Sequence, residues 1–110
     1  MKLPNGDRAV VDMRKLRDYC LSARHPRGRH KARVFASVLG IYESDADLLR
    51  DALLDAALNR EVVPGRADIY GQRYILEFEI RGPAGAGLGR SFWIIRTQES
   101  FPRLTSCYVM

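Results

Sequence analysis

The spacing of apolar residues divides the chain into two halves. Up to Asn59, apolar residues recur every three or four positions, which places them on one face of an α-helix. From Val62 onward they recur at every second position, the spacing of a β-strand with one buried face. This change of period predicts helices in the first half of the chain and strands in the second.

Two helices are predicted before residue 40. The first begins after Asp12, a good N-cap residue, and runs to about Leu21. The second begins close to Pro26 and ends at Leu39, with Gly40 as its C-cap. Their predicted buried stripes are Met13, Leu16, Tyr19 and Cys20 in the first helix, and Ala32, Phe35, Ala36 and Leu39 in the second.

A third helix is predicted to end near Asn59. Ser44 and Asp47 resemble a capping box at its start, because a hydroxyl and a carboxylate three residues apart can bond each other's backbone N–H groups. Its predicted core positions are Ala46, Leu49, Leu53, Ala56 and Ala57.

Alternation in the second half predicts an antiparallel sheet. Strands are expected over residues 62–69, interrupted by Pro64-Gly65, and over about 73–80, 90–97 and 104–109. Residues 92–95 are apolar on both faces, which places their strand in the middle of the sheet. We therefore expect an α+β fold in one domain over residues 1–110, with three N-terminal helices packed on a C-terminal antiparallel sheet of three to four strands. The residues expected in its core are Phe35, Leu39, Leu53, Leu76, Phe78 and Ile94.

The segment Gly82-Pro83-Ala84-Gly85-Ala86-Gly87-Leu88-Gly89 is rich in glycine, like a nucleotide-binding loop. Phosphate-binding loops lead from a strand into a helix, whereas this one joins two predicted strands and has no Lys-Ser/Thr ending. The segment is therefore predicted to be a flexible hairpin loop.

Charge is unevenly distributed along a chain whose formal net charge is +5. Between Arg8 and Arg33 nine cations face two acids, whereas six acids face two arginines between Glu43 and Glu61. Such a dipolar surface suits a polyanion such as nucleic acid better than a membrane. The alternative is that fifteen arginines against three lysines reflect genomic base composition and bind nothing.

Several other classes of site lack a signal in the sequence. No apolar run is long enough to span a membrane and the first residues do not form a signal peptide, so a cytoplasmic location is expected. Cys20 and Cys107 fit no metal or redox spacing and are expected to be small buried side chains. His25 and His30 are five residues apart and share no helical face, so no metal and no cofactor is expected.

The most informative segment is 24–33, which gathers cations on a loop and the first turns of a helix. Backbone N–H groups and the helix dipole add to the attraction for phosphate there. Lys31 borders the buried stripe, where an amine is held more firmly than on a free surface and is a catalytic candidate. Its alternative role is to cover apolar surface with its stem. His25, in the loop before Pro26, suits either proton transfer or a polar turn.

The last two strands carry a second set of candidates. Ser106 and Tyr108 share one face of the last strand, with Thr105 and Cys107 on the other, and Arg96 lies on the strand before. An arginine, a hydroxyl and a phenol on a concave sheet face would bind phosphate and stabilise a pentacoordinate transition state. Tyr108 alone is also an ordinary strand residue.

These residues resemble a known pattern. The pattern consists of His25-Pro26-Arg27-Gly28, Lys31-Ala32 with Phe35, Leu39-Gly40, Trp93 and the last strand. With these residues the chain resembles a bacterial domain family of unknown function that has the pattern HPxG, KAxxF and LG. Such domains are similar to toxin domains of polymorphic toxin and toxin–antitoxin systems that have the barnase, EndoU, colicin and RelE fold of metal-independent ribonucleases. The resemblance extends from Ala9 to Val109.

The resemblance implies RNA as substrate, a small antitoxin-like partner protein and a set of site residues. It carries over His25, Lys31, Arg103, Ser106 and Tyr108, although threonine is expected where Ser106 stands and apolar residues or glycine where Arg29 and His30 stand. In the enzyme hypothesis His25 or Lys31 transfers protons, Arg96 and Arg103 stabilise transition-state charge, and Ser106 and Tyr108 orient groups or donate a proton. The residues expected to bind nucleic acid are Arg24, Arg27, Arg29, Arg33 and Arg103.

The alternative hypothesis is a noncatalytic module that binds a small partner protein or RNA through the same cationic surface. The two hypotheses differ in geometry: the enzyme requires Lys31, Arg96 and either Ser106 or Tyr108 to line one cleft.

Overall fold

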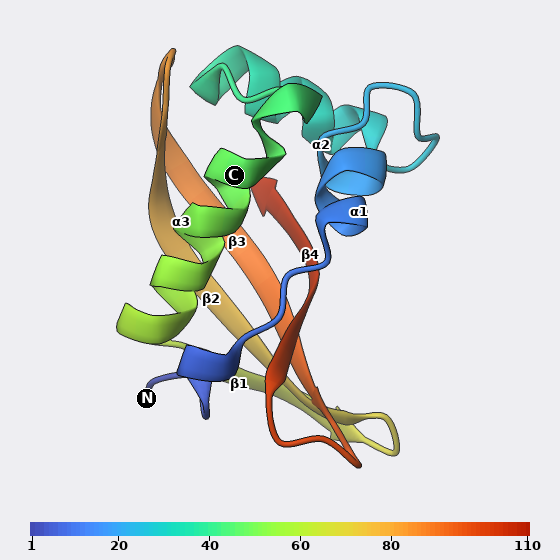
Figure 1. Ribbon diagram of the computed structural model, residues 1–110, viewed down its shortest axis with the longest axis vertical. Helices are drawn as coiled ribbons and strands as arrows, with labels where there is room; N and C mark the ends of the chain where they lie inside the picture. Colours follow the sequence, from blue (N-terminus) through green and yellow to red (C-terminus); the bar gives the residue numbers. More distant parts are fainter.

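Three helical segments precede a four-stranded sheet in the computed structural model, which describes residues 1–110 (Figure 1). Two helices end in a π-helical turn. The segments are α1 (Met13–Lys15) continued by η2 (Leu16–Cys20), α2 (Arg29–Val34) continued by η3 (Phe35–Leu39), and α3 (Ala46–Asn59) after the short turn η4 (Glu43–Asp45). A further short turn, η1 (Gly6–Arg8), lies before α1.

The sheet is an antiparallel meander. Its strands are β1 (Val63–Asp68), β2 (Gly71–Gly82), β3 (Gly85–Arg96) and β4 (Pro102–Val109), in the spatial order β1-β2-β3-β4. The predicted α+β class is therefore confirmed, as is the central place of the strand that holds residues 92–95. β1 is irregular between Pro64 and Ala67, because proline lacks the N–H group that a regular ladder needs.

The helix ends agree with the sequence except in two places. Asp12 caps α1 by accepting a bond from the N–H of Arg14, and Gly40 ends η3 with a φ of 67°. The second helix begins at Arg29, because a turn over residues 26–28 comes first. The predicted Ser44–Asp47 capping box is wrong. Instead the carboxylate of Asp45 accepts a bond from the N–H of Tyr42, so the pair that forms is shifted by two positions from the predicted one.

The glycine-rich segment forms the predicted hairpin, but it is not a flexible loop. Only Pro83 and Ala84 make the turn, and the later glycines lie within β3. A Cβ on Gly82 would lie 2.2 Å from the carbonyl oxygen of Leu39, and one on Gly89 would lie 2.3 Å from Cδ1 of Ile80. Gly82 therefore allows the hairpin to pack closely against the end of η3, and Gly89 leaves room for Ile80 of the neighbouring strand.

The core lies between the helices and one face of the sheet. Figure 1 shows α3 along that face, with α1 and α2 beside the far end of β4. All six residues expected in the core are buried: Phe35, Leu39, Leu53, Leu76, Phe78 and Ile94. No helix is long and apolar enough to cross a membrane.

The outer edge of β4 is covered in two different ways. At its beginning, the N–H of Val10 donates to the carbonyl of Pro102, and the N–H of Leu104 donates to the carbonyl of Val10. Further along, η2 and α2 pack against the strand. Side chains of the two helical segments therefore meet the second half of β4.

Candidate functional site

The amine of Lys31 lies where α2, η2 and β4 meet. Its Nζ donates to Oη of Tyr19 at 3.2 Å and to Oγ of Ser106 at 3.1 Å. It also lies 5.0 Å from the centre of the Tyr19 ring and 5.8 Å from that of Tyr108. No carboxylate forms an ion pair with Lys31, so two hydroxyl oxygens and two aromatic rings hold this half-buried cation.

The HPxG segment brings α2 against η2. Nδ1 of His25 accepts bonds from the N–H groups of Arg27 at 3.0 Å and Gly28 at 3.1 Å. Gly28 packs so closely on η2 that a Cβ there would lie 2.0 Å from the carbonyl oxygen of Tyr19. The His25 ring meets the Tyr19 ring edge-on at 4.8 Å. Histidine and glycine thus set the position from which Lys31 reaches Tyr19.

The same bonds limit what His25 can do chemically. An Nδ1 that accepts two N–H bonds carries no proton, so in the neutral ring the proton is on Nε2. Such a ring cannot accept a further proton without losing both backbone bonds. The polar turn role that the sequence left open is therefore present, and Lys31 is the better placed of the two candidates for proton transfer.

A β-bulge in β4 places two hydroxyls beside Lys31. Phe92 of β3 pairs with Ser106, whereas the next residue, Trp93, pairs with Leu104, which leaves Thr105 as an extra residue. Thr105 and Ser106 consequently line the same cavity. The expectation that Thr105 lies on the opposite face from Ser106 is wrong, because the extra residue interrupts the alternation of side chains.

Tyr108 belongs to a polar chain that the sequence did not indicate. Nη1 of Arg90 donates to Oη of Tyr108 at 3.1 Å, and Nη2 of Arg90 lies 3.2 Å from Oε2 of Glu77. The bonds with Tyr108 and Glu77 raise the pKa of the Arg90 guanidinium. Nε of Arg90 is buried without a partner. Arg90 and Tyr19 are site residues that sequence reasoning missed, since their spacing is that of ordinary strand and helix positions.

An open cavity of about 380 Å³ lies beside this cluster. It is lined by Lys15, Tyr19, His25, Arg27, Thr105 and Ser106. Lys15 and Thr105 also line a smaller cavity of about 100 Å³, which reaches Ile94, Arg96 and Arg103. Ile94 and Arg96 in turn line a third cavity of about 580 Å³. These three neighbouring cavities share lining residues, and we name them together the β4 groove.

The two arginines of the groove differ in their freedom. Both carboxylate oxygens of Glu99 accept bonds from Arg103, at 2.8 and 2.9 Å, and Oε1 lies 4.0 Å from Nε of Arg96. The bond from Arg103 lowers the pKa of Glu99. Arg103 is thus held and neutralised, whereas Arg96 is more than half exposed. Lys15 and Arg27 have no acidic partner.

The structure brings together only part of the predicted site. Lys31, Ser106, Tyr108, His25 and Arg27 surround one end of the β4 groove. Arg96 and Arg103 line its continuation, and Lys31 lines none of the three cavities, so the single cleft that the enzyme hypothesis requires is formed only in part. The other predicted cations lie elsewhere: Arg29 and Arg33 line a separate cavity with Tyr42, and Arg24 lies 3.7 Å from Glu43. No group of three or more His, Cys, Asp or Glu side chains lies close enough to hold a metal ion.

Two buried thiols lie directly behind the cluster. Cys20 follows Tyr19 in η2, and Cys107 lies between Ser106 and Tyr108 in β4; both are free and buried. A hydrogen bond with Cys107 lowers the pKa of Cys20 to about 7, with a smaller contribution from the charge of Lys31. The same bond and burial raise the pKa of Cys107. Of the two thiols, Cys20 is therefore the one that loses its proton at the lower pH.

Comparisons with known proteins define the family. Residues 2–110 match the model of DUF6883, a domain of unknown function, and the chain belongs to this family. A comparison with curated proteins finds no match. One similar solved chain comes from a contact-dependent growth inhibition toxin–immunity protein complex of Klebsiella pneumoniae 342. Its TM-score is 0.74 at 20% sequence identity, over 92% of this chain and 99% of that one, so the likeness concerns the fold.

Proposed function

We propose that this protein is a toxin-like endoribonuclease that cleaves RNA without a metal ion. The observation that carries the proposal is the position of Lys31. Its amine lies between the hydroxyls of Tyr19 and Ser106, faces the Tyr108 ring and has no carboxylate partner. A groove with further unpaired cations begins beside it. An anionic substrate that enters the groove supplies the negative charge that this site lacks.

The proposed reaction starts when the Lys31 ammonium gives a proton to solvent, after which the amine takes the proton of a ribose 2′-OH. The 2′-oxygen forms a bond to the adjacent phosphorus, and the bond from phosphorus to the 5′-oxygen of the next nucleotide breaks. The Lys31 ammonium stays beside the phosphorane and stabilises its charge. Tyr108 gives its phenol proton to the leaving 5′-oxygen, and the neighbouring Arg90 stabilises the phenolate. The products are a 2′,3′-cyclic phosphate and a free 5′-hydroxyl.

The remaining candidates bind or position groups in this proposal. Ser106 and Tyr19 orient the Lys31 amine, and His25 keeps the preceding turn in place. Arg27 contacts the phosphate at the cleavage site, and Arg96 contacts a neighbouring phosphate further along the groove. Arg103 contributes less, because Glu99 already neutralises it.

The similar solved chain supports the toxin-like part of the proposal and the involvement of a small partner protein. That chain comes from a complex of a growth inhibition toxin with its immunity protein. A fold of the barnase, EndoU, colicin and RelE type is consistent with helices that precede an antiparallel meander. We infer that a small protein covers the β4 groove and inhibits the enzyme. In the noncatalytic alternative, the same groove only binds that partner or RNA.

The test is cleavage of end-labelled single-stranded RNA by the purified protein in the presence of EDTA. We expect products that end in a 2′,3′-cyclic phosphate and no cleavage of DNA, which lacks the 2′-OH. Lys31→Ala is expected to lower the rate by ~100-fold or more, and Tyr108→Phe is expected to lower it as well. Lys2→Ala is the matched control, because it removes the same charge from an exposed position outside the groove.

Two results contradict the proposal in different ways. If Lys31→Ala and Tyr108→Phe cleave RNA at the wild-type rate, the assigned site is wrong even though the protein is a nuclease. If the wild type cleaves no RNA but binds a small acidic protein, the noncatalytic alternative is the better account.

A further inference from the structure

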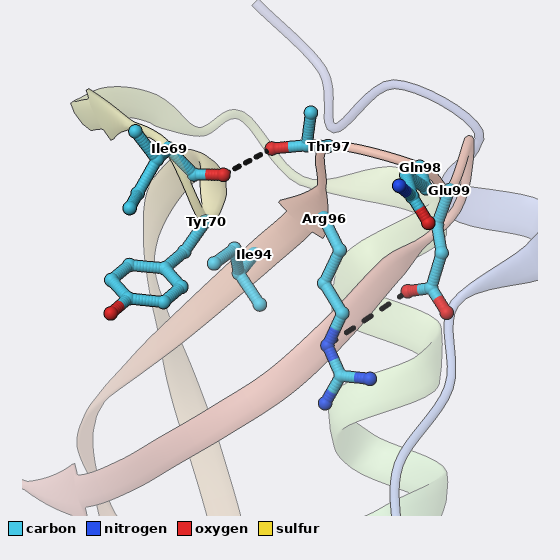
Figure 2. A pocket seen from close by; sticks show the side chains of 7 residues that line it. All are labelled: Ile69, Tyr70, Ile94, Arg96, Thr97, Gln98 and Glu99. Atoms are coloured by element: carbon cyan, nitrogen blue, oxygen red, sulfur yellow. Dashed lines mark hydrogen bonds and ion pairs between the residues drawn. The ribbon is translucent and has the colours of Figure 1, made fainter.

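The largest cavity of the molecule lies at the far end of the β4 groove and takes no part in the proposed chemistry. Figure 2 shows its two walls, which come from two hairpin turns. Ile69 and Tyr70 of the β1–β2 turn form one wall, and the β3–β4 connection forms the other with Thr97, Gln98 and Glu99. Ile94 and Arg96 lie between these walls, and both also line the middle cavity of the groove.

The two walls are fixed to each other. Oγ1 of Thr97 donates to the carbonyl of Ile69 at 2.7 Å, and the N–H of Thr97 donates to the carbonyl of Tyr70 at 3.2 Å. Asp68 supports the first turn by accepting a bond from the N–H of Tyr70 at 2.9 Å. The cavity is therefore formed before any ligand arrives, and a ligand does not have to order the two turns.

Apolar surface is exposed here without an evident structural reason. Ile69 is 82% exposed and Tyr70 66% exposed, the two highest values among the large hydrophobic side chains of the chain. The hydroxyl of Tyr70 has no partner within the protein, so nothing holds the ring in place except its own turn. The cavity offers the flat ring of Tyr70 beside the apolar side chain of Ile94, together with the amide of Gln98 and the guanidinium of Arg96. This combination matches the surface of a nucleobase that carries a phosphate.

Continuity with the site strengthens this assignment. The cavity shares Ile94 and Arg96 with the middle of the groove, which shares Lys15 and Thr105 with the cavity beside Ser106. Ser106 and Arg103 are three residues apart on β4, a distance of about 10 Å along the strand. A ligand that reaches from the Lys31 cluster to Tyr70 is therefore a chain of several units.

We propose that this cavity binds an unpaired base of the RNA chain, stacked on Tyr70, while Arg96 contacts the phosphate that leads toward the cleavage site. The inference rests on the proposed function, since it takes single-stranded RNA as the ligand. It adds a specificity site several nucleotides from the bond that is cleaved. The side-chain amide of Gln98 is the group placed to distinguish one base edge from another.

The test measures binding separately from cleavage. The probe is a short fluorescein-labelled 2′-O-methyl oligoribonucleotide, which cannot be cleaved because its 2′-oxygen is blocked, and fluorescence anisotropy gives its Kd. We expect Tyr70→Ala to weaken binding about tenfold, the effect of losing one base–aromatic stack, and Tyr70→Phe to bind like the wild type. Tyr42→Ala is the matched control, because Tyr42 is 59% exposed and lies outside the groove.

A second probe with the same backbone but abasic residues identifies the contact. On this probe Tyr70→Ala and the wild type are expected to bind equally, because no base is left to stack. If Tyr70→Ala binds the first probe as tightly as the wild type, or loses the same affinity for both probes, the base site is wrong. Cleavage of natural RNA by the wild type is measured in parallel. If the wild type does not cleave RNA, the proposed function is wrong. If Tyr70→Ala binds the RNA probe with unchanged affinity, only this inference is wrong.

Discussion

Among single residues, His25 shows how a candidate for catalysis acquires a different role in the fold. Its Nδ1 satisfies the N–H groups of Arg27 and Gly28, and Gly28 is buried against Tyr19. His25→Ala removes the one atom that accepts both bonds, and a buried N–H without a partner costs about 1–3 kcal/mol. We expect urea denaturation to show a decrease of this size in the free energy of unfolding. RNA cleavage is expected to decrease as well, because the turn that positions Lys31 is weakened.

His25→Asn separates the turn role from proton transfer. An asparagine side chain accepts a bond from the N–H two residues ahead, so it replaces part of the histidine cap. We expect this variant to be more stable than His25→Ala and to recover cleavage activity in proportion. A variant that is as stable as the wild type but inactive would show that the imidazole transfers a proton after all.

The thiol pair predicts how the stability of the protein changes with pH. The pKa of Cys20 is lowered from 9.0 to about 7 by its bond with Cys107. Between these two values the unfolded chain binds more protons than the folded one, so the free energy of unfolding rises with pH over this range. Above this pH range the free energy of unfolding falls with pH instead, because the raised pKa of Cys107 keeps that thiol protonated in the folded state.

Chemical denaturation at a series of pH values checks this expectation. We expect the free energy of unfolding to rise between pH 7 and 9 in the wild type and not in Cys20→Ala. The variant keeps every other titrating group, and only the surroundings of Cys107 change. The small cavity left by the substitution lowers stability at all pH values and does not change the slope. Parallel pH profiles for the two proteins would mean that Cys20 stays protonated in the fold.

At the scale of secondary-structure elements, the cations of α2 and of the turn before it lie on two separate faces. Arg27, in the turn just before α2, lines the β4 groove, whereas Arg29 and Arg33 line a different cavity. RNA affinity falls with salt by about 0.7 log units per log unit of salt for each phosphate contact. We expect Arg27→Ala to reduce that slope by about one contact and Arg29→Ala to leave it unchanged. Equal effects of the two substitutions would place the RNA across α2 rather than in the groove.

The elements themselves were largely predictable, because the apolar period reports directly which face of each element is buried. The bulge at Thr105 was not, since an extra residue in one strand leaves no trace in the alternation of that strand alone. The glycines of the β2–β3 hairpin were misinterpreted for a related reason. Their function is close approach to Leu39 and Ile80, which depends on packing between distant segments.

The site was predictable only in part. Lys31, Ser106 and Tyr108 were found through the resemblance to a family pattern, because the sequence spacing of 75 between Lys31 and Ser106 carries no local signal. Tyr19 was assigned to the buried stripe, whereas it is half-buried against the core and its hydroxyl accepts a bond from Lys31. Arg90 alternates like any strand residue, and its bond to Tyr108 arises only when β3 and β4 pair.

On the scale of the whole molecule, the distribution of charge matters more than its sum. The net charge of +5 includes exposed arginines that are paired with acids or lie away from the groove. Three cations without a close bidentate partner line the groove, namely Lys15, Arg27 and Arg96, and a fourth, Lys31, lies beside it in contact with Ser106. If each contacts one phosphate, the logarithm of the binding constant falls by about 3 for each log unit of salt.

Glu99 and Asp12 are the acids that line the groove, and Asp12 is paired with Arg14, so removal of Glu99 tests this account. Glu99→Gln releases Arg103 from two charge-assisted bonds and leaves it free for a phosphate. We expect tighter binding of the uncleavable RNA probe at low salt and a salt slope steeper by about 0.7, measured by anisotropy titrations at several salt concentrations. Glu79→Gln removes the same charge from an exposed pair with Arg81, outside the groove, and is expected to keep the wild-type slope. If both variants show the same slope, general electrostatic attraction explains the binding and the RNA does not follow the β4 groove.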